Sequence, residues 1–375
     1  MTLGVMATPF HMRGAAFNRG NAWATRNGWT LSRVYSSVED EALAARSAVV
    51  LSDITWRWRV TIEGAQAANF LSRLATKNLA ELSPGMAAKA LWLTDGGAVR
   101  GAGLFARFGR EAFALAASAP DTDWIAQSAA LFGVTVRDIS PEQGGLAIIG
   151  PYAAHVLRAA GLACDLAPLA FRKLFWRGLD ITLSRWGEHE GYEIWCAADD
   201  GLLVWDRLMK AGGGYGIVPA GLDAMDVLDI EAGILRPGRD YKAASDTHAC
   251  APTPMSLGLE TLIDAERGGF NGRAAWAATR KNETHILAGI EIESETPAAH
   301  TPLQCAGAVV GHTLTSVFSP ALRRAIALAR IEKSAAAVGT QLSLTLAPCA
   351  QRPEFRTVHA YVAEMPFLPT PQMAI

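Results

Sequence analysis

Two segments of the chain share one pattern of apolar and polar positions. Residues 60–74 (VTIEGAQAANFLSRL) and 146–160 (LAIIGPYAAHVLRAA) each begin with strand-like apolar residues, pass through a glycine and continue with apolar residues at helical spacing. In both segments the glycine precedes a leucine by seven residues. Chance would explain two such turns, but we favour a pair of similar α+β units built on antiparallel strands.

A third pattern, between these segments, predicts three strands. Residues 87–118 alternate apolar and polar positions around turns at residues 95–97 (Asp-Gly-Gly) and near Gly109. A phosphate-binding glycine loop would instead run from a strand into a helix, so these glycines indicate a hairpin. Gly101 and Gly103 then lie inside a strand, where a missing side chain indicates either close approach of another molecule or a bulge.

The last quarter of the chain has a different pattern. From about residue 283, short apolar strands are separated by turn residues and followed by a tail with several prolines. This spacing predicts a separate all-β domain. A chain of 375 residues also exceeds one ordinary core, so two or three domains are expected.

Composition and charge exclude several classes of protein. The formal net charge of −2 disfavours nucleic-acid binding. The five cysteines are widely spaced without a Cys-x-x-Cys pair, and no histidine or cysteine cluster has metal-ligand spacing, so we expect neither a disulfide framework nor a metal. Because the chain lacks a signal-peptide core and any run of about 18 uncharged apolar residues, we expect a cytoplasmic protein that does not enter membranes. The oligomeric state stays open.

Seven islands of sequence resemble, in matching order, the aminomethyltransferase family typified by the T-protein of the glycine cleavage system. Their character is closest to the tetrahydrofolate-dependent demethylases of that family. The islands cover residues 43–64, 70–85, 93–99, 191–195, 219–241, 268–276 and 315–331.

The resemblance implies an α+β fold with three domains around a central folate site. It implies a discontinuous folate-binding domain (1–54 plus 142–240), an α+β domain that carries the glycine hairpin (55–141 plus 241–282) and a C-terminal β-barrel (283–375). Tetrahydrofolate is the implied cofactor, and a small-molecule methyl donor is the implied partner.

The strongest single match concerns the folate site. In the family, a glutamate that closes a Gly-Phe-Glu strand accepts hydrogen bonds from the pterin ring, and Gly191-Tyr192-Glu193 matches it. One carboxylate can accept two adjacent N–H groups. We therefore expect Glu193 to bind the cofactor, with Tyr192 beside it and Trp186 as an aromatic wall. A carboxylate on a surface strand is the alternative, and His189 is a minor candidate.

Three departures from the family pattern change the expected charge of the site. Arg100 and Gly101 stand where aminomethyl-transferring members carry an Asp pair, Lys89 aligns with a site tyrosine, and residues 224–226 lack a usual arginine. We expect Arg100 and Lys89 to act in catalysis, neutralised by the substrate or by an acid such as Asp53 or Asp226. Exposure of both cations to solvent is the alternative.

Arg57 and the adjacent Trp56 are the expected substrate-binding residues. Trp56 and Trp58 flank Arg57 where the family's Asp-Val-Ser-His-Met-Gly stretch enters the site. An arginine there can stack on or cap an aromatic donor. A buried core role for the tryptophans is the alternative.

These residues predict an enzyme that moves a methyl group from a small, anionic, methylated donor to tetrahydrofolate. Direct displacement by one folate nitrogen needs no carboxylate at the position of Arg100. Two alternatives are an aminomethyltransferase of glycine-cleavage type and a non-catalytic folate-binding assembly or regulatory protein. The second is weakened because residues 267–272 (RGGFNG) lack that branch's cysteine.

Overall fold

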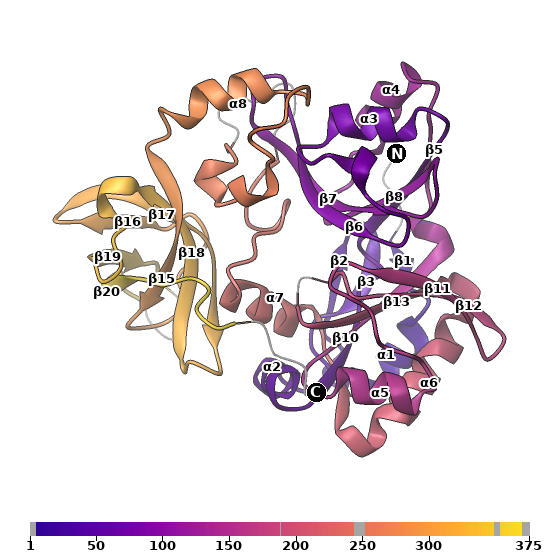
Figure 1. Cartoon of the computed structure of the whole chain (residues 1–375). Helices are drawn as coiled ribbons and strands as arrows, with labels where there is room; N and C mark the ends of the chain where they lie inside the picture. The colour runs from indigo at the N-terminus through magenta and orange to yellow at the C-terminus, as the bar shows by residue number, and fades with distance from the viewer. Residues whose placement is uncertain (1–4, 188, 244–251, 349–352, 370–375) are drawn as a thin grey trace. The chain divides into compact units, whose positions relative to one another are not determined.

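A computed structural model describes residues 5–187, 189–243, 252–348 and 353–369 of the chain. The chain divides into two compact units (Figure 1). The first unit holds residues up to 90 and residues 102–225, and the second holds residues 91–101 and 226–369. The three-domain boundaries expected from the resemblance stay a prediction.

A six-stranded sheet forms the core of the first unit. Its strands are antiparallel to their neighbours, except that β14 runs parallel to β4. The strands, in spatial order, are β11 (Phe171–Trp176), β12 (Leu179–Ser184), β13 (Gly191–Ala197), β10 (Gln143–Ile149), β4 (Val49–Asp53) and β14 (Ile217–Pro219). The helices α5 (Ala153–Ala159) and α6 (Gly201–Gly212) pack on each other and against β13. Val204, Trp205 and Leu208 recur at helical spacing on α6 and are buried against the sheet.

A second sheet follows the same strand-and-helix pattern. Its strands, in spatial order, are β6 (Ala87–Leu93), β7 (Val99–Arg107), β8 (Ala112–Ala117), β5 (Trp58–Glu63) and β9 (Thr135–Asp138). The predicted pair of similar segments is confirmed, because β5 leads into α3 (Ala67–Leu74) and β10 leads into α5. Gly64 and Gly150 make the two turns with φ of +143° and +123°, which favours glycine.

Smaller elements complete the first unit. The three-stranded sheet contains β1 (Met6–Ala7), β3 (Trp29–Ser32) and β2 (Trp23–Arg26). The remaining helices are α1 (His11–Phe17), α2 (Val38–Ser47) and α4 (Thr122–Ala130), while α7 (Leu222–Glu231) crosses the boundary between the units. The side chain of Ser37 caps α2 by accepting a hydrogen bond from the backbone of Asp40 at 3.0 Å.

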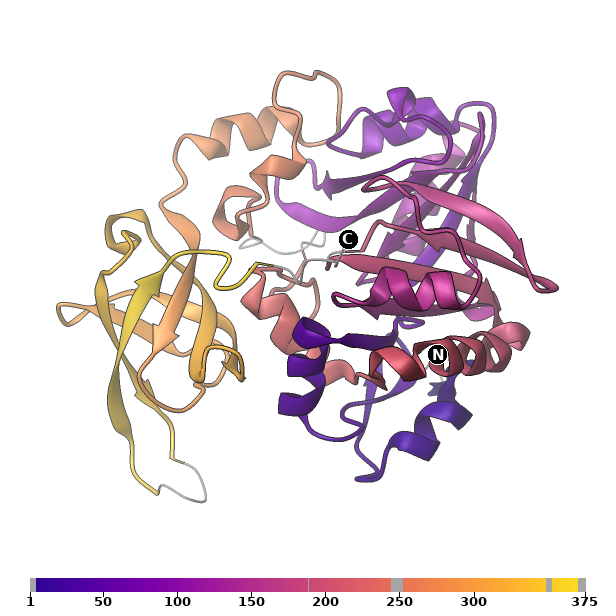
Figure 2. The ribbon, with the colours of Figure 1, turned by 60° about the horizontal axis from the view of Figure 1, so that its bottom comes forward.

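The second unit contains the predicted all-β domain, which is a closed barrel (Figures 1 and 2). Alternating side chains of its strands fill the interior with apolar residues. Its strands, in spatial order, are β15 (His285–Ile292), β18 (Arg324–Glu332), β17 (Ala308–Ser319), β16 (Pro302–Cys305), β19 (Gln341–Leu346) and β20 (Arg356–Ala363). The helix α8 (Arg273–Arg280) precedes the barrel.

Short 3-10 helices join the larger elements of both units. They are η1 (Leu79–Glu81), η2 (Ser140–Glu142), η3 (Ala198–Asp200), η4 (Gly213–Tyr215), η5 (Met255–Leu257), η6 (Glu260–Leu262) and η7 (Lys333–Ala335).

The glycine-rich stretch is a hairpin between β6 and β7, as predicted. The backbone N–H of Thr94 donates to the carbonyl of Ala98 at 3.0 Å, and Gly97 has a φ of +80°. A Cβ added at Gly101 would lie 2.1 Å from the ring of Trp92. Gly101 therefore makes room for a core side chain of its own chain, so the expected approach of another molecule is not needed to explain it.

Three other expectations concern cysteines, metals and membranes. Over the described parts of the chain, Cys164, Cys196 and Cys305 are free, whereas Cys250 and Cys349 lie outside the described residues. The residues placed by the structure hold no group of three or more histidine, cysteine or acidic side chains that could bind a metal. In the same residues, no helix is long and apolar enough to cross a bilayer.

Candidate functional site

The side chain of Glu193 lies on one face of β13, at the centre of the six-stranded sheet. Its strand neighbours are Ala147 on β10 and Ser184 on β12. Side chains alternate along a strand, so Glu193 and Trp195 share this face while Tyr192 points to the other. The whole strand except its last residue is buried, which places the Glu193 carboxylate in a low-dielectric environment.

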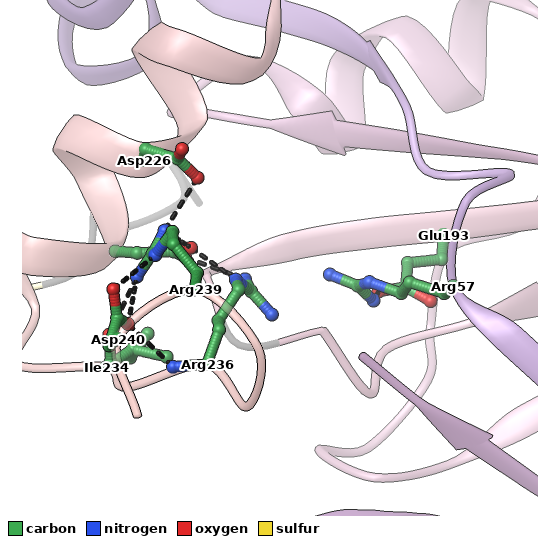
Figure 3. Close-up of polar contacts among 8 residues, drawn as sticks. Arg57, Glu193, Asp226, Ile234, Arg236, Arg239 and Asp240 are labelled. Carbon is green, nitrogen blue, oxygen red and sulfur yellow. Dashed lines mark hydrogen bonds and ion pairs between the residues drawn. The ribbon is translucent and has the colours of Figure 1, made fainter. Parts of the chain in front are cut away.

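Three side chains donate hydrogen bonds to the Glu193 carboxylate. Arg57 donates from Nη1 to Oε1 and forms an ion pair (Figure 3). Trp186 and Trp195 donate their indole N–H groups to Oε2 at 2.7 and 3.2 Å. A carboxylate offers about four acceptor positions, so the protein itself uses both positions on Oε2 and leaves one on Oε1.

Arg59 is a second cation near this carboxylate, and it is buried. Its guanidinium is 4.0 Å from the centre of the Trp195 ring and donates from Nη1 to Gln143 at 2.6 Å. Ser140, at the start of η2, accepts the backbone N–H of Arg59 at 2.8 Å and so fixes this end of β5. We call Arg57, Arg59 and Glu193 the arginine cluster. It contains two cations and one anion.

The pKa of Arg59 reports how poorly its charge is compensated. Burial is the main cause that lowers this pKa to about 10, while the attraction of Glu193 opposes the shift and the nearby charge of Arg57 adds to it. Arg59 still carries its proton at neutral pH, so the cluster has a net charge of +1 there. Buried net charge is unfavourable unless a counter-charge approaches.

Of the two other residues predicted to bind the cofactor, Trp186 contacts Glu193 and Tyr192 does not. The ring of Trp186 contacts Phe171 and its indole N–H donates to Glu193, so the structure brings Trp186 to this carboxylate. Tyr192 faces the apolar core, and its hydroxyl donates to the carbonyl of Cys164 at 2.7 Å. Burial raises the pKa of Tyr192 to about 12. The structure therefore does not bring Tyr192 to the Glu193 carboxylate.

Trp56 is part of a small apolar cluster with Trp29, Leu31 and Leu222, and Arg26 lies 4.8 Å above its ring. Its side chain is buried. This placement matches the core alternative for Trp56, although Arg57 next to it in sequence turns toward Glu193.

The two predicted catalytic cations are both half-buried. Lys89 lies on β6 in the first unit and has no ion-pair partner among the residues that the structure places. Arg100 lies on β7, in the part of that strand that belongs to the second unit. The acids named as their possible partners have other contacts: Asp53 accepts from Thr8 at 2.6 Å, and Asp226 pairs with Arg239 at 2.6 Å.

His189 is buried in the loop before β13.

Arg59 and Trp195 are functional candidates that sequence reasoning missed. For Trp195 the signal was available, because Glu193 and Trp195 are two residues apart in one strand and two-residue spacing puts strand side chains on one face. What the spacing could not show is that Arg57, in the bend before β5, reaches Glu193, or that Arg59, on β5, lies over the ring of Trp195.

A second buried charge network lies in the second unit. Arg239 donates to Asp226 and Asp240 at 2.6 Å each and to Asp229 at 3.1 Å, and Arg236 also pairs with Asp229 (Figure 3). Burial alone would lower the pKa of Arg239, but hydrogen bonds to Asp240 and the charges of the three aspartates outweigh it and raise the pKa. In this network both arginines have carboxylate partners, so neither cation is left without an anion.

Two family models match successive parts of the chain. The family model described as the GCVT N-terminal domain matches residues 12–267, and the glycine cleavage T-protein C-terminal barrel domain matches residues 286–368. An aminomethyltransferase of Symbiobacterium thermophilum is 32% identical over 361 residues, covering 92% of each chain. One of Bacillus cereus is 30% identical over 333 residues, covering 85% of this chain and 88% of the relative.

A solved structure agrees with these matches. The glycine cleavage system aminomethyltransferase T from Bartonella henselae aligns with a TM-score of 0.86 and 22% identity, covering 99% of this chain and all of the other. At that identity the likeness concerns the fold, which is α+β with a C-terminal barrel. The chain belongs to the aminomethyltransferase family typified by the glycine cleavage T-protein.

Proposed function

We propose that this protein is an enzyme that transfers a one-carbon unit to tetrahydrofolate. The observation that carries the proposal is the buried Glu193 carboxylate held by Trp186, Trp195 and Arg57 at the position that the family resemblance assigns to pterin recognition. A rigid carboxylate between aromatic side chains suits a flat ring with N–H groups on its edge.

The number of acceptor positions refines how Glu193 binds a pterin. Both lone-pair positions on Oε2 receive indole N–H groups, and one on Oε1 receives Arg57. A pterin edge that donates two parallel hydrogen bonds therefore has to displace the longer bond from Trp195, or make one bond to Oε1. Glu193 of this chain contributes less folate affinity than a carboxylate without internal partners.

For the donor, two classes each have support. The arginine cluster and Lys89, all in the first unit, support a small anionic donor whose methyl group is displaced by one folate nitrogen. Formation of a methylene bridge passes through an iminium-like cation instead, and an arginine would oppose that charge. This chemistry favours methyl transfer with 5-methyltetrahydrofolate as the product.

The relatives support the second class more directly. The curated proteins of 27 to 32% identity carry the name aminomethyltransferase. By this likeness the donor is an aminomethyl group on a carrier, and the product is methylene-tetrahydrofolate. A demethylase with a methylated donor has no support from these names.

One experiment separates the two classes. The unmodified protein is incubated with tetrahydrofolate and an aminomethyl-lipoyl carrier protein, and separately with S-, N- and O-methylated acids, and the folates are resolved by chromatography. We expect 5-methyltetrahydrofolate from one methylated acid. Rapid methylene-tetrahydrofolate formation from the carrier would establish the aminomethyltransferase function, and no conversion from any donor would contradict both.

A further inference from the structure

The arginine cluster has more hydrogen-bond donors than the protein uses. A guanidinium carries five N–H groups. The Arg57 side chain is only 14% exposed and makes one hydrogen bond, to Glu193. Its Nε is buried without a partner among the described residues. The Arg59 side chain likewise makes one, to Gln143, and its Nε is also unpartnered within the described chain.

Arg239 shows that this chain can satisfy a buried arginine completely. Its Nε, Nη1 and Nη2 all donate to aspartate oxygens. The two environments shift the pKa of arginine in opposite directions, upward for Arg239 and downward for Arg59. Polar groups buried without partners are uncommon in proteins and need a specific reason.

We propose that Arg57 is the contact residue of a carboxylate-binding subsite, with Arg59 as a second cation that strengthens it. A planar carboxylate can accept two parallel N–H···O bonds from the N–H groups of Arg57 that Glu193 does not use. It also supplies the one negative charge that two arginines and Glu193 lack. Gln143 and Trp195 hold Arg59 in place without adding charge.

Two molecules of the proposed reaction carry carboxylates: the small acidic donor and the glutamyl tail of tetrahydrofolate. The choice of these ligands rests on the proposed function, whereas the charge imbalance does not. Binding is measured without turnover, so a chain that binds acids through Arg57 but transfers no one-carbon unit would contradict only the proposed function.

The test compares acids with their amides on the full chain by isothermal titration calorimetry. The small probes are 4-methoxybenzoate and N,N-dimethylglycine, each against its primary amide, and the folate probes are tetrahydrofolate and 6-methyltetrahydropterin, which lacks the tail. We expect at least one acid to bind the native protein more tightly than its neutral counterpart by about 10- to 100-fold.

Variants assign that preference to the cluster. Arg57→Gln should remove it, Arg57→Lys should keep part of it, and Arg59→Met should weaken the acids without changing amide binding. Arg13→Gln is the matched control, because Arg13 pairs with Asp206 at 2.7 Å on the exposed surface. A loss for tetrahydrofolate alone would identify the glutamyl tail, and a loss for a small acid would identify the donor.

Two results would overturn the proposal. One is that no acid and no folate binds a folded Arg57→Gln protein more than threefold more weakly than the native protein. The other is that the native protein shows no preference for acids over their neutral counterparts, a result that needs no variant and so holds even if Arg57→Gln does not fold.

Discussion

Replacing Glu193 by glutamine should destabilise the first unit strongly, because it leaves the buried Arg59 and the half-buried Arg57 without an anion. Glutamine keeps the size of glutamate but presents an NH₂ group where either Arg57 or the two indole N–H groups now donate. Breaking a buried ion pair by removing one partner costs about 3–5 kcal/mol. Since the Arg57 and Glu193 side chains are 14% and 4% exposed, solvent screening relieves little of this cost.

A double variant tests whether charge imbalance causes this loss of stability. Arg57→Met added to Glu193→Gln removes one of the unpaired cations, so the double variant should be more stable than Glu193→Gln alone. Arg57→Met by itself should cost less than Glu193→Gln, because the two tryptophans and the charge of Arg59 continue to stabilise the Glu193 carboxylate. A second substitution that restores stability is expected if charge imbalance is the cause, and is not expected if a change of packing is the cause.

Urea unfolding followed by tryptophan fluorescence provides the measurement, since Trp186 and Trp195 contact Glu193 directly. Asp223→Asn is the control, because it breaks the exposed pair with Arg33 and should cost about 0–1 kcal/mol. A loss below about 1 kcal/mol for Glu193→Gln, or a double variant less stable than both single variants, would refute the assignment of a net positive cluster.

Two further changes test local features of the fold. Gly101→Ala should lower the free energy of unfolding by about 1–3 kcal/mol or more, because the new Cβ would lie 2.1 Å from the ring of the buried Trp92. Gly96→Ala on the same hairpin should have little effect, because the nearest atom to its new Cβ would be 3.7 Å away. Equal effects of the two variants in chemical denaturation would contradict this packing. Burial raises the pKa of Cys196 to about 12, so its thiol should stay unmodified by iodoacetamide at pH 8 in the native protein and react only after unfolding. Peptide mapping that finds Cys196 labelled before unfolding would show that the surroundings of this thiol are open to solvent.

The sequence was sufficient for elements whose signal is local. Gly64 and Gly150 each end an apolar strand and precede a helical spacing, and both make the predicted turn with positive φ. The hairpin at residues 95–97 and the barrel strands follow from turn residues at regular intervals. Each of these depends on contacts between residues close together in the chain, which is why periodicity predicted them.

The arginine cluster depends on contacts across the sequence. Arg57 and Glu193 are 136 residues apart, and their pairing follows from how the bend before β5 and the strand β13 are placed in the first unit. The alternation of side chains along a strand could have separated Tyr192 from Glu193, because adjacent residues of a strand face opposite sides. It could not have shown that the space beside Gly101 is filled by Trp92.

The contrast between Arg59 and Arg239 explains why the cluster is better understood as a binding feature than as a source of stability. Arg239 is held by three aspartates, and its raised pKa means that the folded state favours its charge. Arg59 has a pKa lowered to about 10, so the folded state disfavours the same charge at neutral pH. Selection for stability alone would replace Arg59 by an apolar residue, as buried ion pairs often can be without loss. The charge of Arg59 becomes favourable when an anion binds beside Arg57 and neutralises the net positive charge of the arginine cluster. Binding then stabilises the folded chain by mass action.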